Sequence, residues 1–204
     1  MFDTVLCPSG ATRGVLLIHG GSGRGDHERA RGDRLAALGY AVYAPDLFGG
    51  PPTRDTIMAL VGDPIELRRR VVSAWRVLAD RVPLTVAVGH CFGGLVALEL
   101  ARAESDVRAV VSLHGMLSTR APVPAIRPRV LACTGAADPF CPPEQRSAFE
   151  AEMTAAGADW QHLIFGGATH GFSVPDIARD GCAYHADADR RSWSAMLALF
   201  AEVT

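Results

Sequence analysis

The sequence predicts an α/β fold in which a mostly parallel sheet is covered by helices on both faces. Short apolar runs, of which residues 15–18 are an example, lack polar alternation and are typical of strands buried on both faces. Longer stretches with helical apolar periodicity alternate with these runs along almost the whole chain. The irregular stretches, 46–63, 115–128 and 166–185, are short, and the chain has no repeat or low-complexity tract. We therefore expect a single domain over residues 1–204, without a large cap domain.

The N-terminal part of the chain contains two expected strands with a helix between them. The strand at 15–18 is followed by a glycine-rich loop and by a helix over about 26–38, which Gly39 ends. The next strand covers 40–44, and Pro45 closes it because proline has no amide hydrogen to donate to a strand ladder.

The middle of the chain has a clear helix start signal. Asp63 followed by Pro64 is a capping carboxylate with proline at the first helical position, and the helix that it opens ends before Pro83. The strand at 84–88 then leads into a helix over about 92–102. The remaining expected elements are strands at 107–113, 129–134 and 160–165 and helices at 143–156 and 186–202.

The composition excludes several classes of function. The chain of 204 residues has a net charge of −2, which provides no basic surface for nucleic acid or an anionic membrane. No apolar run is long enough to span a membrane, and the N-terminal residues have no targeting pattern, so we expect a cytoplasmic protein. The basic residues 68–70 share an expected amphipathic helix with Glu66, and we interpret them as a solvated face.

The cysteines indicate neither a disulfide scaffold nor a metal site. There are five, an odd number, and their spacing follows no disulfide framework. No pair has CxxC spacing and the seven histidines form no HxxxH or HxxH pattern, so we expect no metal and no cofactor. Cys133 falls within an expected strand and is predicted to be a core residue.

One cysteine stands at a position that favours catalysis. Cys91 is the centre of the segment Gly-His-Cys-Phe-Gly-Gly at 89–94, between an apolar strand and an apolar helix. Such a segment is typical of a nucleophile elbow, whose tight turn lifts the nucleophile off the sheet and directs the first helical amides at the reacting group. Because a free cysteine is more often a small buried hydrophobe, this interpretation depends on its partners.

Two residues are candidate partners of the thiol, which near neutral pH needs a base. His170 lies in a glycine-rich turn after the last strand, and Asp138 follows the preceding strand. Each also has a simpler interpretation: local hydrogen bonding for His170, and a turn former or helix cap for Asp138. Together they follow Cys91 in the order nucleophile, acid, base, at intervals of 47 and 32 residues, and so predict a triad.

Acyl transfer also needs two donors for the oxyanion, and the sequence offers a pair. The amide of Phe92 follows the nucleophile, and the loop 18–23 after the first strand supplies Gly21. The competing interpretation of this loop is a phosphate cradle, but it lacks both GxGxxG and a following Lys-Ser/Thr.

Other residues at strand ends are candidates for lining the substrate pocket or supporting its loops. For His114 a structural hydrogen bond is favoured over a substrate contact. The candidates are His19, Gly20, Asp46, His114 and Phe172.

These features resemble the dienelactone hydrolase family of α/β-hydrolases. The motifs that carry the resemblance are Ile18-His19, Gly39-Tyr40, residues 44–47, the elbow, and residues 112–115, 135–139 and 167–172. The resemblance covers nearly the whole chain and implies an α/β-hydrolase fold. It implies Cys91 as nucleophile, His170 as base and Asp138 as the residue that orients the base. It also implies hydrolysis of an ester or lactone of a small acid.

Two positions depart from the family pattern. Members that hydrolyse dienelactone commonly have a glutamate right after the first strand, where this sequence has Gly20. They also have an arginine a few residues beyond the catalytic histidine, whereas His170 is followed by residues 171–175 without one. The departures imply a neutral or differently anchored ester. Without a carboxylate beside Cys91, we expect a resting ion pair between its thiolate and His170.

Two other functions could use the same residues. One is a non-catalytic ligand-binding or regulatory relative, and the other is a redox sensor in which Cys141 resolves oxidised Cys91. The complete triad favours a carboxylesterase that forms a thioester acyl-enzyme with a small-molecule ester or lactone. A monomer is compatible with the sequence.

Overall fold

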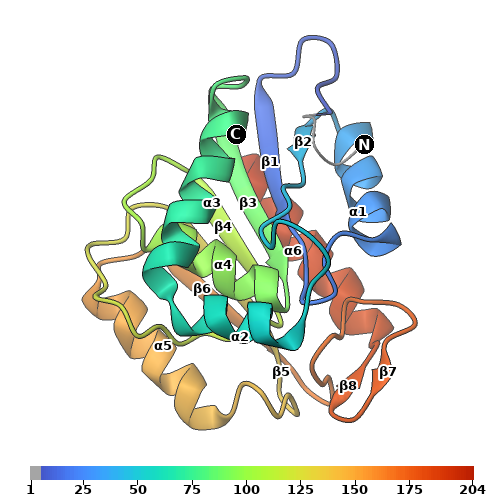
Figure 1. Ribbon diagram of the computed structural model, residues 1–204, viewed down its shortest axis with the longest axis vertical. Coiled ribbons are helices and arrows are strands. Elements are labelled where there is room, and N and C mark those ends of the chain that lie inside the picture. Colours follow the sequence, from blue (N-terminus) through green and yellow to red (C-terminus); the bar gives the residue numbers. More distant parts are fainter. Residues whose placement is uncertain (1–5) are drawn as a thin grey trace.

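Six parallel strands form the centre of the structure, a computed structural model that describes residues 6–204 (Figure 1). Their order across the sheet is β2-β1-β3-β4-β5-β6. The strands are β1 (Arg13–Ile18), β2 (Ala41–Tyr43), β3 (Leu84–His90), β4 (Ala109–Leu113), β5 (Arg129–Gly135) and β6 (Trp160–Phe165). The parallel α/β architecture predicted from the sequence is confirmed.

Helices cover both faces of this sheet. One face carries α1 (Asp26–Ala37) and α6 (Ala186–Val203), and the other carries α2 (Arg54–Gly62), α3 (Pro64–Ala79), α4 (Phe92–Ala101) and α5 (Pro143–Ala155). In Figure 1, α3 and α4 lie in front of the sheet and α6 lies behind it. Alternate side chains of β1 enter the two apolar cores, because successive residues of a strand point to opposite faces. Within residues 6–204, no helix is long and apolar enough to cross a membrane.

The start of α3 follows the signal seen in the sequence. The Asp63 side chain accepts a hydrogen bond from the amide of Glu66 at 3.0 Å, and Pro64 is the first helical residue. The predicted cap is therefore confirmed.

Two short elements lie in segments expected to be irregular. Helix α2 begins where the Thr53 hydroxyl accepts from the amide of Thr56 at 3.1 Å, and Leu60 is its one buried residue. Such a narrow apolar face gives almost no periodic signal. The hairpin of β7 (Ala178–Arg179) and β8 (Cys182–Ala183) is too short to show a strand pattern.

The cluster at residues 68–70 differs from the solvated face that its charge predicted. The Arg68 side chain is 13% exposed, and its Nε donates to Glu99 at 2.7 Å. Glu99 and Arg102 are both fully buried and pair with each other at 3.0 Å. Arg69 and Arg70 do lie nearer the surface, where both pair with Glu66. Arg68 instead belongs to an ion-pair network between α3 and α4.

The register of the sheet brings the ends of its central strands level. His90 lies beside Leu113, and Leu113 lies beside Cys133 on the next strand. The residues that follow these strand ends therefore meet at one edge. Open parallel sheets bind ligands at this carboxyl edge, so the candidate site is expected there.

Candidate active site

Cys91 lies at the corner between β3 and α4. Its φ is 53°, in the left-handed region that residues with a Cβ rarely adopt. A Cβ on Gly89 would overlap the carbonyl of Gly93, and a Cβ on Gly93 would overlap the carbonyl of Ile18 in β1. The two glycines thus allow α4 to approach the sheet closely enough to hold Cys91 in this strained turn.

The side chains of the predicted triad meet at this corner. Nε2 of His170 lies 3.0 Å from Sγ of Cys91, and Nδ1 lies 3.0 Å from Oδ2 of Asp138. The second carboxylate oxygen accepts from the amide of Phe140 at 2.8 Å, so Asp138 also forms the turn that the simpler interpretation assigned to it. This arrangement can pass a proton from the thiol to an imidazole that the carboxylate orients.

Backbone hydrogen bonds hold the two loops of His170 and Asp138 in place. The amide of Ala137 donates to the carbonyl of Ala168 at 3.0 Å, which joins the loops after β5 and β6. The amide of His170 donates to Gly181 at 3.2 Å, and the amide of Ala183 donates to His170 at 3.1 Å. The β7–β8 hairpin therefore fixes the backbone of His170.

The electrostatics of the site favour charge separation between Cys91 and His170. Burial alone would raise the pKa of the Cys91 thiol, but the hydrogen bond and charge of His170 lower that pKa below its ordinary value. Burial would lower the pKa of His170, but hydrogen bonds to Asp138 and Cys91 raise it well above its ordinary value. Both shifts favour the thiolate–imidazolium pair that we expect from the sequence.

Two backbone amides are directed at the same sulfur. Gly21, in the loop after β1, and Phe92, at the start of α4, donate to Cys91 and help to lower its pKa. The Phe92 amide has no partner inside its helix, and the helix dipole adds to its effect on an anion. A carbonyl carbon bonded to the sulfur would bring its oxygen to the same donors.

The other predicted pocket residues divide into one that faces the thiol and three whose side chains are buried. A Cβ on Gly20 would be 3.8 Å from the Cβ of Cys91, so position 20 faces the nucleophile. His19, His114 and Phe172 are each 0% exposed, so none of these side chains lines an open pocket. The sequence located them at strand ends but did not fix the direction in which their side chains point.

His19 instead supports two loops. Its Nδ1 lies 2.8 Å from the carbonyl oxygen of Gly20, and its Nε2 accepts from the amide of Leu47 at 3.1 Å. These partners assign a neutral ring with the proton on Nδ1, and burial lowers its pKa. Asp46 supports the same region, since its carboxylate accepts from the amide of Phe48 at 2.9 Å.

Two apolar residues near the site were not among the sequence candidates. Phe140 is 48% exposed, and its ring lies edge-on to His170 with 5.0 Å between centroids. Ile57 of α2 is the side chain nearest to position 21, 3.8 Å from a Cβ built on Gly21. Phe140 could have been noticed in the sequence, because it is a large apolar residue two positions after the candidate acid Asp138. Ile57 has none, because its helix was not expected.

One cation also reaches the site from the β7–β8 hairpin. Nε of Arg179 donates to the sulfur of Cys182 at 3.2 Å. That hydrogen bond, followed by the charge of the Cys91 thiolate, raises the pKa of Arg179. Cys141, by contrast, is 1% exposed, and burial raises its pKa to about 11, which opposes the thiolate that a resolving cysteine needs.

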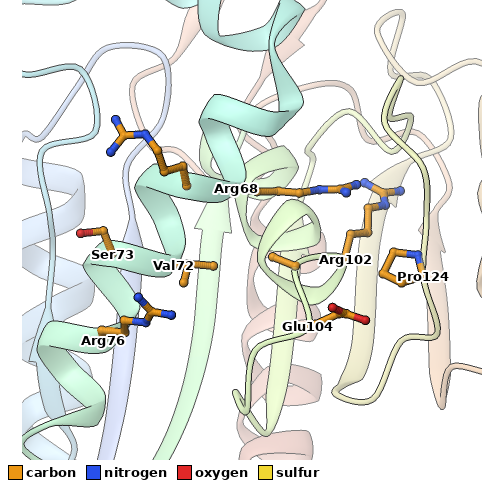
Figure 2. Close-up of a pocket in the computed structure, with 9 residues that line it drawn as sticks. Arg68, Val72, Ser73, Arg76, Arg102, Glu104 and Pro124 are labelled. Carbon is orange, nitrogen blue, oxygen red and sulfur yellow. The ribbon is translucent and has the colours of Figure 1, made fainter.

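A hollow of about 630 Å³ lies apart from this site, between α3 and the end of α4 (Figure 2). Arg102 lines it at the opposite end of α4 from Cys91, roughly 15 Å away along the helix. Two of its four arginines, Arg68 and Arg102, already pair with Glu99. In the part of the chain that the structure describes, no cluster of three or more His, Cys, Asp or Glu side chains could hold a metal ion.

The parallel sheet, the strained corner and the meeting of Cys91, His170 and Asp138 together define an α/β-hydrolase. The model of the dienelactone hydrolase family matches residues 2–204, and the chain belongs to that family. It is therefore a hydrolase of carboxylic esters or lactones.

Individual relatives support the same assignment. A Caenorhabditis elegans protein without an assigned function is 36% identical over 126 residues, which cover 57% of this chain and 78% of that protein. A carboxymethylenebutenolidase homolog of Mus musculus is 28% identical over 158 residues, which cover 71% of this chain and 63% of the relative. The structure of a dienelactone hydrolase-like promiscuous phosphotriesterase from metagenomic libraries is similar with a TM-score of 0.89 and 35% identity, over 96% of this chain and 88% of that one.

Proposed function

We propose that this hydrolase cleaves small esters or lactones by nucleophilic attack of Cys91. The observation that carries the proposal is the position of His170, 3.0 Å from both the Cys91 sulfur and an Asp138 oxygen. Cys91 is partly exposed, so a substrate can reach it. These contacts support a catalytic role over a non-catalytic ligand-binding one.

In the acylation step, the Cys91 thiolate attacks the carbonyl carbon of the ester. The carbonyl electrons move to oxygen, and the amides of Gly21 and Phe92 stabilise the oxyanion. When the tetrahedral intermediate collapses, the carbon–oxygen bond to the alcohol breaks. The leaving alkoxide takes the proton of the His170 imidazolium, and a thioester remains on Cys91.

In the deacylation step, neutral His170 takes a proton from water as the water oxygen attacks the thioester carbon. The second tetrahedral intermediate expels the Cys91 thiolate, and the acid leaves. His170 is protonated again, so the ion pair is restored. Because turnover needs a reduced thiol, we also propose a cytoplasmic location.

The surroundings of the thiol support a small acyl group that is either neutral or bound by a residue other than the arginine of the family pattern. Gly20 places no carboxylate beside Cys91, and Phe140 and Ile57 provide apolar surface close to the triad. Arg179 is a cation near the site, but it already donates to Cys182.

A second candidate activity is hydrolysis of phosphotriesters. The relative at 35% identity is described as a promiscuous phosphotriesterase. In that reaction the Cys91 thiolate attacks phosphorus while the phosphoryl oxygen accepts from the two amides. The phosphorus–oxygen bond to the leaving alcohol breaks as its oxygen takes the His170 proton, and water, with His170 as base, then hydrolyses the thiophosphate ester left on Cys91.

The test is a panel of small lactones, aryl esters, thioesters and one aryl phosphotriester, assayed with wild type and Cys91→Ala. Cys7→Ala serves as control, because Cys7 is exposed and lies outside the site. We expect hydrolysis of at least one carboxylic ester by wild type and by Cys7→Ala, and a loss of orders of magnitude in Cys91→Ala. Near-full esterase activity in Cys91→Ala would refute the assignment.

A further inference from the structure

His114 occupies a buried position directly beside the His170 ring. It follows β4, and its φ of 41° lies in the left-handed region that favours glycine. Its amide donates to the carbonyl of Cys133 at 2.8 Å, and its side chain is 0% exposed. A strained residue of this kind persists only where its surroundings over-determine its conformation, often near functional sites.

The ring of His114 is joined to the loop that carries His170. Its Nε2 lies 2.9 Å from Oγ of Ser173, which is also 0% exposed and comes three residues after His170. The carbonyl of Ser173 accepts from Nη2 of Arg31 at 2.9 Å, and Arg31 pairs in turn with Asp189. Ser173 is therefore held by both its side chain and its backbone.

Two aromatic rings contact the imidazole of His170. The ring of His114 lies edge-on to it with 5.2 Å between centroids and an angle of 71°. The ring of Phe140 lies edge-on with 5.0 Å and 80°. The two ring nitrogens of His170 lie at hydrogen-bond distance from Cys91 and Asp138. These two contacts and the two ring contacts together fix the position of the imidazole.

The two nitrogens of the His114 ring have different surroundings. Nε2 shares a hydrogen bond with the Ser173 hydroxyl, whereas Nδ1 is buried beside the backbone of its own residue. The ring is neutral, because burial disfavours its charged form and lowers its pKa.

We propose that His114 is a positioning residue that holds His170, through Ser173 and by ring contact, at hydrogen-bond distance from the Cys91 sulfur. The inference rests on the proposed function, since it concerns the base of that mechanism. It goes beyond that function by assigning a role to a side chain that cannot reach the substrate. Loosening the His170 ring weakens the bond that favours the thiolate, so the reactivity of Cys91 reports the effect directly.

The charged neighbours of His114 keep its ring uncharged while the thiol titrates. Burial and then the charge of His170 place the pKa of His114 well below its ordinary value. His27 and Arg31 act in the same direction, and the ring of His90 lies 6.1 Å from that of His114. A change in the titration of Cys91 after substitution of His114 therefore reports the position of His170 and not the loss of a charge.

The experiment measures the rate at which iodoacetamide alkylates Cys91, against pH, by mass spectrometry of the peptide that contains it. The variants are His114→Phe, which keeps a ring, Ser173→Ala, and the double variant. The matched control is His162→Phe. The His162 side chain is 2% exposed, and its Nε2 lies 2.9 Å from the hydroxyl of Thr134. Its ring contacts Phe149.

We expect each single variant to raise the alkylation midpoint and, below the wild-type midpoint, to slow the reaction about fivefold to tenfold, the effect of losing one hydrogen bond on the thiolate fraction. The double variant should be no slower than about the slower single one, because both remove the same contact. Ester turnover should show a lower kcat with KM nearly unchanged. Thermal unfolding identifies folded variants, and His114→Gln, which keeps a donor, should restore part of the rate.

The outcomes separate this proposal from the proposed function. A wild-type midpoint in both folded Ser173→Ala and folded His114→Phe, or an equal shift in His162→Phe, would overturn the positioning role even if Cys91→Ala has lost its esterase activity. A shifted midpoint in a protein that hydrolyses no ester would support the positioning role and refute the proposed function.

Discussion

Introducing a carboxylate at position 20 is predicted to suppress the reactivity of Cys91. A Cβ there would lie 3.8 Å from the Cβ of Cys91 and 3.6 Å from the carbonyl oxygen of His90, which is ordinary van der Waals contact. The Cβ of a side chain at position 20 therefore fits, and we take a separation of about 5 Å between the carboxylate of Gly20→Glu and the sulfur, within the range over which neighbouring charges shift a pKa.

The magnitude follows from the repulsion between two negative charges. At about 5 Å and an effective dielectric constant of about 20, it is roughly 3 kcal/mol, or about two pKa units. Position 20 is partly exposed, so solvent screening reduces the expected rise in the thiol pKa to about one unit. Below the wild-type midpoint, where the thiolate fraction falls about tenfold for each unit of rise in pKa, alkylation should then slow about tenfold.

The assay is the alkylation rate of Cys91 by iodoacetamide from pH 4 to pH 10, for wild type, Gly20→Glu and Gly20→Gln. The glutamine variant has nearly the same size without the charge, and it should stay near wild type. Equal slowing in both variants would show a steric effect, and an unchanged Gly20→Glu would refute the electrostatic reasoning. A wild-type thiol that titrates near 8.5 would contradict the resting ion pair.

Three further predictions concern other parts of the molecule. His170→Ala should reduce kcat/KM for ester hydrolysis by orders of magnitude. Asp138→Asn should reduce it by less, because the asparagine keeps the His170 ring in place but no longer controls which ring nitrogen carries the proton. Glu99→Ala removes a carboxylate that pairs with the fully buried Arg102. Urea titrations should show a free energy of unfolding that is lower by about 3–5 kcal/mol. The surface control Asp187→Ala should change that free energy little. Burial lowers the pKa of His90 well below 6.5, so the unfolded chain binds a proton there that the folded chain does not. Stability should therefore fall as the pH drops below about 6.5, and a His90→Phe variant with an equally steep loss would contradict this reasoning.

The sequence predicted the sheet and most of its helices because their signals are local. Continuous apolar strands and the Asp63-Pro64 start signal require only neighbouring residues. Helix α2 was missed because Leu60 is its one buried residue, so the segment shows almost no amphipathic pattern.

The candidate site was predictable in its residues but not in the direction of all its side chains. The order of Cys91, Asp138 and His170 follows from where strands end, and the structure brings the three together. Whether His19 or His114 faces the substrate depends on loop packing, and both rings are buried. The sequence also did not reveal ion pairs between residues that lie far apart in the chain.

The ion pair of Arg68 is an example. Its sequence neighbours are arginines, which predicts a solvated face, but its partner Glu99 lies 31 residues further along the chain. Only the packing of α3 against α4 reveals that pair.

The central claim is that Cys91 forms a thioester with the substrate. The most direct measurement is rapid acid quenching of the enzyme during turnover of p-nitrophenyl acetate, followed by mass spectrometry of its peptides. We predict a burst of p-nitrophenol equal to the enzyme concentration and one acetyl group on the peptide that contains Cys91, both absent from Cys91→Ala. Steady turnover in which the acetyl group never appears on Cys91, or appears equally on Cys7, would contradict the account.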